Sequence, residues 1–600
     1  MQISYSRNDK LISRKFYQYL IPTVLMVLAM QFGSLADAIV IGNFLGDSFL
    51  SASSLALPAI FLVEIPAMMI GTGASIVAAN FIGKRQVMEA SKTFKLSLFL
   101  AFVSGLVFVP IAIFAADPIS LLFAGNYPNL APMISQYMQA YAYQSPIIGV
   151  GIVVAYFLPS DNHPNLGAAF FVVSNVVHIA SEILFCLFLD RSVAMWGVAF
   201  SMGIGMFAGL AVLVPYLCSK KRAVDLKVPF KGAFSYAGGL LKAGSAAGVL
   251  TGLSFVYYLV LNLAATAYLS EAEIPVFAML SNFAFVVDLF LIGVLQIMPS
   301  VVSSLHGEKD YFAVRSVVKR VLIIATGVTL ALLTVSVVFP ELFFIIFGVD
   351  LQAVRAGMAP GMPDPLLVVR VYCISFLFYA ANRFVVYYYP SILVNSPALL
   401  NNAIRVGLIG PIVIYFLMWS QGVLGNAIGV IIMEAATLGV TLAFILIGKK
   451  LKRFPGTGLL LLPKDDANQK VLDISIPAAE HEISKAIEEL QRYATELSHS
   501  ETSGAMLALA SEEIIANVIA YGYKRKAGTH FIDVRVCLVE EGLLVRIRDD
   551  GIAFDPTTYQ TDEEDMRYSG IEVIRKVASE FKYLRVLNTN NTIMVITING

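Results

Sequence analysis

The stretch "IPTVLMVLAMQFGSLADAIVIGNFLG", residues 21–46, is almost entirely apolar and contains a single charged side chain, Asp37. A helix needs about 20 apolar residues to cross the hydrocarbon core of a bilayer. The stretch therefore predicts a membrane-spanning helix. A charged group at bilayer depth costs about 2.5–3.5 kcal/mol on insertion scales. Asp37 is for this reason a candidate for function.

The composition extends this prediction to most of the chain. Of its 600 residues, 58% are hydrophobic and 14% are charged, and the mean hydropathy is +0.75. Soluble domains carry about 25% charged residues, so we expect an integral membrane protein. The first apolar run is too long for a cleavable signal peptide and is followed by further apolar runs. The four cysteines are far apart, which predicts neither a zinc site nor a disulfide framework.

Twelve apolar segments are long enough to span a bilayer. They begin near residues 18, 52, 95, 134, 165, 193, 238, 275, 319, 366, 396 and 421. Lys and Arg gather in loops on the cytoplasmic side of membrane proteins. Loops on one side carry 22 of them, whereas the opposite loops carry three, Arg191, Arg355 and Arg370. We expect both termini in the cytoplasm and the spans in a bacterial inner membrane.

A weak internal repeat divides these segments into two sets of six. A shift of 224 residues places Glu64 on Asp288 and Gly83 on Gly307. Transporters are often built from such paired halves. The sequence predicts one half over residues 1–218 and a second half over residues 219–450.

The apolar spans stop near Lys450, and a soluble α/β domain is predicted over residues 469–600, after a linker at 451–468. Up to Arg453 the chain has 27 Lys/Arg against 19 Asp/Glu, and after it 15 against 23. Alternation and helical periodicity predict strands at 471–477, 529–539, 542–549, 582–588 and 592–598, and helices at 478–498, 504–523 and 570–581. The excess of acidic residues excludes nucleic acid as a partner.

Several ionisable residues fall within the predicted spans, where each is a functional candidate: Asp37, Glu64, His178, Glu182, Asp288, Arg383, Arg405 and Glu434. His178 and Glu182 are four apart and share a helix face. Together with Asp37 they could exchange protons near neutral pH. Other roles are open: His178 could satisfy a buried carbonyl, and Glu182 could lie near an interface. Glu64 and Asp288 could be structural, and Arg383 could neutralise an acid, bind an anionic substrate or end a helix.

The pattern "IPTVLMVLAMQFGSLADAIVIGNFLG…GTGASIVAANFIG", with a looser copy from Gly244 to Gly307, resembles the multidrug and toxic compound extrusion (MATE) family. The resemblance covers residues 10–450 and implies a cation-antiporting exporter with two six-helix bundles. Asp37 matches the family's cation-binding aspartate in the first helix. The family's asparagine and aspartate in the fifth helix fall on His178 and Glu182, and this departure favours H⁺ over Na⁺.

The tail carries a second constellation of polar residues. Glu513 and Asn517 lie one turn apart in "SEEIIANVIAYGY", where the amide oxygen could ligate Mg²⁺ and the carboxylate could orient a nucleophile. Asp549 ends a predicted strand, and Gly551 follows it. The loop from Thr557 to Gly570 could cover phosphates, with Arg567 among its residues.

This order and spacing resemble the Bergerat-fold ATPase domain, and more closely its anti-sigma-factor serine kinase branch. The resemblance implies Glu513 as base, Asn517 as Mg²⁺ ligand, Tyr523 as the closing aromatic, and Asp549 with Gly551 as the adenine-reading pair. It also places Arg567 and Gly570 in a nucleotide lid. Two positions depart from the pattern, Ala553 and Glu572, and both reduce the contact with phosphates expected from the family.

The predicted fold is an all-α membrane domain of twelve transmembrane helices followed by an α/β sandwich of the Bergerat ATPase type. The predicted function is an H⁺- or Na⁺-coupled antiporter that exports an organic small molecule and has a cytoplasmic domain that binds Mg-ATP or a regulatory protein. The alternative is a membrane-anchored serine kinase or signalling ATPase that uses the transporter-like part as a receptor. A weaker alternative is a flippase for lipid-linked precursors.

Overall fold

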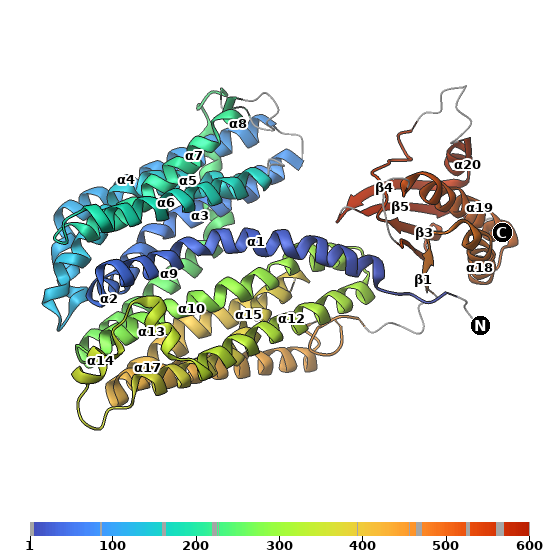
Figure 1. The fold of residues 1–600 in the computed structure, drawn as a ribbon. Helices are drawn as coiled ribbons and strands as arrows, with labels where there is room; N and C mark the ends of the chain where they lie inside the picture. The colour runs from blue at the N-terminus through green and yellow to red at the C-terminus, as the bar shows by residue number, and fades with distance from the viewer. Residues whose placement is uncertain are drawn as a thin grey trace.

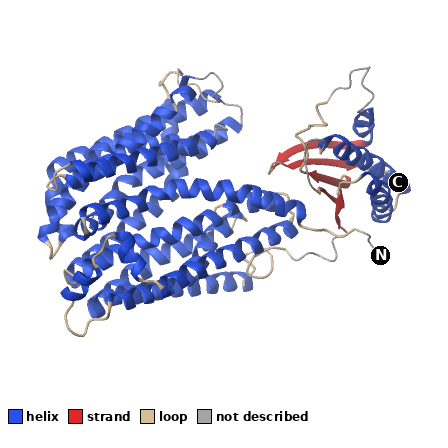
Figure 2. Ribbon diagram, viewed as in Figure 1, coloured by secondary structure: helices blue, strands red, loops and turns tan. Residues whose placement is uncertain are grey.

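The computed structural model of the chain describes most of the membrane part and most of the tail. The described residues are 5–83, 87–158, 164–218, 225, 227–392, 394–454, 456–463, 471–523, 529–559, 569–587 and 589–598. Long helices fill the first part of the chain, and all named strands lie in the tail (Figure 2).

The membrane part is built from helices that run roughly side by side (Figure 1). Their bounds are α1 Lys10–Val40, α2 Asp47–Leu55, α3 Leu57–Gly83, α4 Val87–Ala124, α5 Ala131–Phe157, α6 Pro164–Phe188, α7 Ala194–Val212, α8 Val214–Cys218, α9 Ala237–Tyr268, α10 Glu273–Leu295, α11 Ser303–Gly307, α12 Tyr311–Val338, α13 Glu341–Phe347, α14 Leu351–Gly357, α15 Pro365–Ser391, α16 Ser396–Ile404 and α17 Gly410–Lys450. Short side chains begin some of them, since Asp310 caps α12 and Asp364 caps α15.

Within the described residues, 11 helical stretches are long and apolar enough to cross a membrane. One of them, Glu501–Gly522, lies in the tail and packs on its sheet. Another, Ser396–Lys450, is 55 residues long and breaks inside α17, where Gly422 has a φ of 56°. The sequence places the start of a new span at this break. The chain is a multi-pass membrane protein, and the number of twelve spans stays a prediction.

Two helices connect the group α3–α7 with the group α10–α17. In Figure 1, α1 lies between the two groups, and it packs against α6 on one side and α10 on the other. Helix α9 packs along α3, where Gly73 and Gly244 allow the backbones to meet. A Cβ on Gly244 would lie 1.8 Å from the Met69 carbonyl oxygen, and a Cβ on Gly73 would lie 2.1 Å from that of Leu240. A larger residue at either position would force these helices apart.

The tail forms one antiparallel sheet with helices on one face. Its strands are β1 Val471–Pro477, β2 Phe531–Val539, β3 Gly542–Asp549, β4 Ala578–Val586 and β5 Thr589–Ile596, in the order β1-β2-β3-β5-β4. Helices α18 Glu480–Ser498, α19 Glu501–Asn517 and α20 Ser569–Val577 cover it. Every second residue of the first three strands faces these helices, including Ile474, Val534 and Val545.

Several predicted boundaries in the tail differ from the structure, and one difference changes the element type of residues 578–581. The sequence predicts a helix to residue 581, but α20 ends at Val577 and β4 begins at Ala578. Residues 578–586 form a hairpin with β5, in which Ala578 is opposite Ile596 and Val586 is opposite Thr589. Tertiary strand pairing thus overrides the helical periodicity of these residues.

Candidate functional site

Two helices bring the predicted coupling residues together inside the membrane part. Asp37 is on α1, and His178 and Glu182 lie one turn apart on α6. The distance from His178 Nε2 to Asp37 Oδ1 is 3.2 Å, and ligand atoms of all three residues lie within 4.8 Å of one another. The spacing seen in sequence therefore becomes a compact group of two carboxylates and an imidazole.

This group lies at the wall of a cavity of about 340 Å³. Asp37, His178 and Glu64 line the cavity, whereas Glu182 is fully buried behind it. Among the described residues, neither carboxylate oxygen of Glu182 accepts from a donor group, and its contact with the Asp37 carboxyl group needs a shared proton. Buried carboxylates without partners are costly, and a proton or a cation shared with Asp37 would remove that cost. The imidazole or a carboxylate of this group could hold H⁺, and the carboxylate oxygens could also hold Na⁺.

Glu64 on α3 also lines a second cavity, of about 570 Å³. Tyr141 Oη donates a hydrogen bond of 3.2 Å to Glu64 Oε1. Asp288 lines this second cavity as well. Glu64 and Asp288, which occupy equivalent positions in the internal repeat, therefore face the same cavity. The remaining walls are rich in aromatic rings: Phe61, Tyr257, Tyr258, Tyr372, Phe376, Tyr379 and Tyr387.

The cations of the second cavity are paired. Arg383 Nη2 lies 2.7 Å from Asp288 Oδ2, and Arg405 Nη1 lies 2.8 Å from Glu434 Oε1. Both guanidinium groups also lie over the Tyr379 ring, at 4.9 and 5.4 Å from its centroid. Of the three roles open to Arg383 from sequence, the structure shows the pairing with an acid. It also identifies Arg405 and Glu434 as a second pair.

Two of the candidate nucleotide residues line a smaller cavity in the tail, of about 90 Å³. Asn517 Nδ2 donates to Glu513 Oε1 at 2.7 Å, and Asn517 and Asp549 both line the cavity. Gly570 lies against Glu513: a Cβ there would be 2.0 Å from the Glu513 carboxyl carbon. The structure thus brings residues from α19, β3 and α20 to one place. Arg567 lies outside the described residues.

Asp549 is held in one orientation by its neighbours. Its Oδ1 accepts a hydrogen bond of 2.7 Å from the Gly551 N–H and one of 2.8 Å from Asn590 Nδ2. Sequence reasoning missed Asn590, which is opposite Asp549 in the β3–β5 register and also lines the cavity. Only the strand order could have identified it.

The trailing aromatic and the two departures from the ATPase pattern also have defined places. Tyr523 stacks on His530, with ring centroids 4.3 Å apart, while Tyr521 is the tyrosine that lines the cavity. Ala553 lines the cavity, and Glu572 is exposed in the first turn of α20. The ring of Tyr523, the closing aromatic of the motif, is therefore engaged by His530 in the described arrangement, and its role at the nucleotide stays a prediction.

Comparisons with known proteins agree with this two-part architecture. Residues 22–184 match the MatE family model, and residues 476–597 match the model of the histidine kinase-like ATPase domain. The probable multidrug resistance protein YoeA of Bacillus subtilis (strain 168) is 23% identical over 226 residues, which are 37% of this chain and 48% of that protein. The match therefore spans about half the length of that relative.

Solved structures show the same fold in the membrane part. An inward-facing multidrug resistance MATE family transporter of the MOP superfamily has a TM-score of 0.61 and 18% identity, covering 72% of this chain and 99% of that one. The MATE multidrug transporter DinF-BH gives 0.58 at 17% identity, covering 75% and 99%. A MOP superfamily transporter from Pyrococcus furiosus Vc1 (DSM3638) gives 0.56 at 18% identity, covering 75% and 98%. The chain therefore joins a MatE domain with the MATE transporter fold to a C-terminal histidine kinase-like ATPase domain.

Proposed function

We propose that this protein is a cation-coupled exporter of an organic solute, located in a bacterial inner membrane with both termini in the cytoplasm. The halves 1–218 and 219–450 would alternate access to the two cavities described above. The observation that carries the proposal is the group Asp37, His178 and Glu182, whose ligand atoms lie within 4.8 Å of one another at a cavity wall. Paired titratable groups buried at bilayer depth are typical of ion pathways.

The coupling ion favoured by this group is H⁺. His178 supplies an imidazole ring that can accept a proton, and it contacts Asp37 directly. A proton bound by His178 from one side would turn its contact with Asp37 into an ion pair, and release of the proton to the other side would weaken that contact. Na⁺ would have to use the carboxylate oxygens with a ring nitrogen, which is a softer ligand than oxygen.

The second cavity favours an aromatic solute, neutral or cationic. Its two arginines are already paired with Asp288 and Glu434, so their charges are balanced. Glu64 has a hydrogen bond from Tyr141 and lines both cavities. The aromatic walls, including the stacked Phe61 and Tyr258 rings 5.0 Å apart, could hold a planar ring or a cation over their faces.

The experiment is solute efflux from proteoliposomes driven by a pH gradient or by a Na⁺ gradient, with a fluorescent aromatic cation as probe. Asp37→Asn should abolish efflux under either gradient. Glu341→Gln, which removes an exposed carboxylate on α13, is the matched control and should leave efflux unchanged. Efflux by Asp37→Asn at the wild-type rate would refute the coupling role.

For the tail we propose Mg-ATP binding with a regulatory role. Asn517 would ligate Mg²⁺, Glu513 would orient the nucleophile, and Asp549 would read the base. Ligand pockets are usually about 300–1,000 Å³. The described cavity of about 90 Å³ would hold little more than the base. Isothermal titration of the full-length protein with Mg-ATP tests this, since Asp549→Asn should lose binding. ATP-dependent protein phosphorylation without any solute flux would instead favour the kinase alternative.

A further inference from the structure

The outer face of the tail sheet is charged but buried. The residues of β1–β3 that point away from the helices include Asp473, Asp533, Arg535, Arg546 and Arg548. The charged face of an antiparallel sheet is normally exposed to solvent. Yet Arg548 is only 1% exposed and Asp533 only 2%. Another part of the chain must cover this face.

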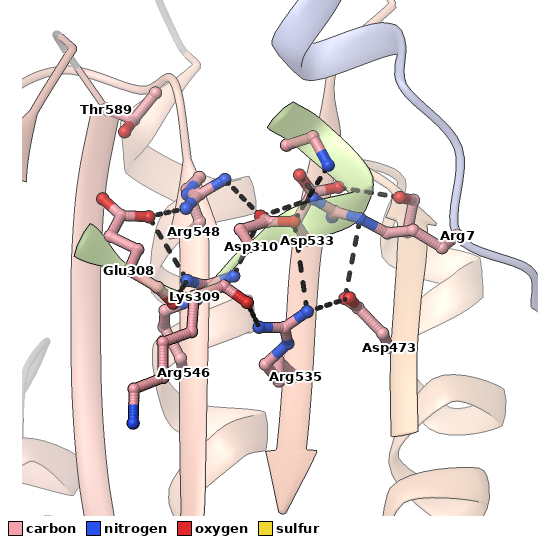
Figure 3. A network of polar contacts seen from close by, with 12 residues as sticks. Arg7, Glu308, Lys309, Asp310, Asp473, Asp533, Arg535, Arg546, Arg548 and Thr589 are labelled. Carbon is pink, nitrogen blue, oxygen red and sulfur yellow. Dashed lines mark hydrogen bonds and ion pairs between the residues drawn. The ribbon is translucent and has the colours of Figure 1, made fainter. Parts of the chain in front are cut away.

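The loop between α11 and α12 is one part of that cover (Figure 3). Asp310 in this loop is 0% exposed and lies 3.0 Å from Arg548 Nη1 and 3.2 Å from Arg546 Nη2. Glu308 lies 3.2 Å from Arg546 Nη1 and also pairs with Arg548. Arg535 donates to the Lys309 carbonyl oxygen at 2.9 Å. Two arginines of β3 and one of β2 therefore hold a three-residue loop of the membrane part.

The N-terminal segment, residues 5–14, is the other part of the cover. Arg7 lies 3.2 Å from Asp310 and 3.5 Å from Asp473, and it pairs with Asp533. The Asn8 N–H donates to Ser475 Oγ at 3.1 Å. The same segment is tied to α12 by Asp9, which accepts from Ser316 Oγ at 2.7 Å and pairs with Arg320. The segment thus joins the tail, α12 and the start of α1.

Each arginine at this junction is paired with a carboxylate. Burial raises the pKa of Asp310, but the charges of Arg7, Arg546 and Arg535 outweigh it and hold that pKa below its ordinary value. A depressed pKa means that the carboxylate stabilises the docked arrangement above the ordinary carboxyl pKa of about 3.9. The contribution is lost only as the pH falls below that value.

A last contact connects the junction with the nucleotide cavity. Arg14, in the second turn of α1, lies 3.3 Å from Asp550 Oδ2 and donates to the Thr529 carbonyl oxygen at 2.7 Å. Asp550 follows Asp549, the residue proposed to read the base, and its other oxygen lies 3.0 Å from His530 Nδ1. The N-terminal end of α1 therefore contacts Asp550, the residue next to the proposed base-reading carboxylate of Asp549.

We propose that the outer face of the tail sheet is a docking surface for the protein's own 308–310 loop and 5–14 segment, and that Mg-ATP strengthens this docking. Arg14 fixes the segment that follows Asp549, so docking preorganises the base site, and by reciprocity the nucleotide stabilises docking. Docking holds the N-terminal end of α1 against α12. Since α1 carries Asp37, the docked and nucleotide-bound form transports slowly.

The nucleotide half of this proposal depends on the proposed Mg-ATP binding, whereas docking itself does not. Docking can be measured through Cys537, a partly buried native cysteine two residues beyond Arg535 on the same strand. In the full-length protein, Lys309→Cys should crosslink to Cys537 with a short bifunctional maleimide. Adding Cys537→Ser should remove the crosslink. Absence of a crosslink in Lys309→Cys would overturn docking, whatever the nucleotide does.

Charge-reversal substitutions in the 308–310 loop test which contacts hold this loop on the outer face of the tail sheet. Asp310→Arg places a cation among four arginines, and the crosslinking rate should fall about tenfold or more, as expected for a lost coupling of this type. Glu308→Lys is a milder variant at a residue that is 19% exposed, and it keeps the test valid where Asp310→Arg does not fold. Lys242→Gln, at an exposed cation of α9, is the control and should crosslink as before. Unchanged rates in both loop variants would refute the electrostatic docking.

The nucleotide link has its own readouts. Arg14→Gln should weaken Mg-ATP binding about tenfold, and Mg-ATP should speed crosslinking and slow efflux in the wild type. Asp310→Arg should bind Mg-ATP more weakly and transport at a rate that Mg-ATP no longer changes. If Mg-ATP binds but alters neither crosslinking nor efflux, the link is refuted while the binding function stands. If Mg-ATP does not bind at all, the proposed nucleotide function fails and docking stands alone.

Discussion

His178 Nε2 lies 3.2 Å from Asp37 Oδ1, so a contact between an imidazole and a carboxylate joins α6 to α1 inside the membrane part. Helix α1 lies between the two helix groups and packs on both α6 and α10. A change in the protonation of Asp37 or His178 would therefore act on α1. This helix lies between the two groups and contacts both. Ion binding at this pair, as proposed above, would therefore act directly on the position of α1.

His178→Asn should change the coupling ion. The variant replaces a titratable ring with an amide and leaves Asp37 and Glu182 in place, which restores the residue type that the MATE resemblance expects. Efflux driven by a pH gradient should fall about tenfold or more, in line with the loss of a positioned acid–base group. Efflux driven by a Na⁺ gradient should be retained or rise. Equal loss under both gradients would mean that His178 has a packing role only.

Gly570→Ala should weaken Mg-ATP binding at least tenfold, because a Cβ at this position would lie 2.0 Å from the Glu513 carboxyl carbon. The clash would displace Glu513 and break its 2.7 Å hydrogen bond with Asn517. Titration of the full-length protein with Mg-ATP measures the effect, and a tenfold loss corresponds to about 1.4 kcal/mol. Gly238→Ala is the control, since a Cβ there meets no atom within 4 Å. Wild-type affinity in Gly570→Ala would show that Glu513 does not support the site.

The sequence was sufficient to predict elements whose periodicity is strong. The predicted strands at 471–477 and 542–549 agree with β1 and β3, and the predicted span start near residue 421 falls on the break at Gly422. The helix predicted to residue 581 failed because strand pairing with β5 decides residues 578–581. The local sequence pattern gives only the conformational preference of a segment. Whether the segment pairs with a neighbouring strand depends on residues elsewhere in the chain.

The candidate sites divide in the same way. His178 and Glu182 share one helix, so their spacing could be read directly, and Asp37 was indicated by its charge at bilayer depth and then by the family resemblance. The pairing of Arg405 with Glu434 joins two helices, and Asn590 reaches Asp549 only through the β3–β5 register. The Asp310 junction joins a loop, the N-terminus and the tail, which are hundreds of residues apart. Contacts of this kind depend on the folded arrangement and have no signal in a single sequence.

Asp288→Asn should destabilise the membrane part. Arg383 loses its ion pair and keeps only neutral partners, and removing one member of a buried pair costs about 3–5 kcal/mol. Asp288 and Arg383 retain some exposure to the cavity, with side chains 11% and 21% exposed, so we expect the lower end of this range. Thermal unfolding in detergent measures the loss. The double variant Asp288→Asn with Arg383→Gln removes the unpaired cation and should recover part of the stability; no recovery would show that the two residues act independently.

Gly422→Ala should also lower stability, and it tests the break within α17. Gly422 has a φ of 56° and a ψ of −139°, a combination that glycine adopts readily and that costs other residues about 1–3 kcal/mol. A Cβ there would lie 2.3 Å from Glu273 Oε1, which accepts a 2.9 Å hydrogen bond from the Val423 N–H. The substitution therefore strains the backbone and disturbs the contact that holds the second segment of α17 to α10. We expect a lower unfolding temperature in detergent, with Gly439→Ala, whose Cβ meets no atom within 4 Å, unchanged. An unaltered unfolding temperature in Gly422→Ala would mean that α17 can run through this position without the break.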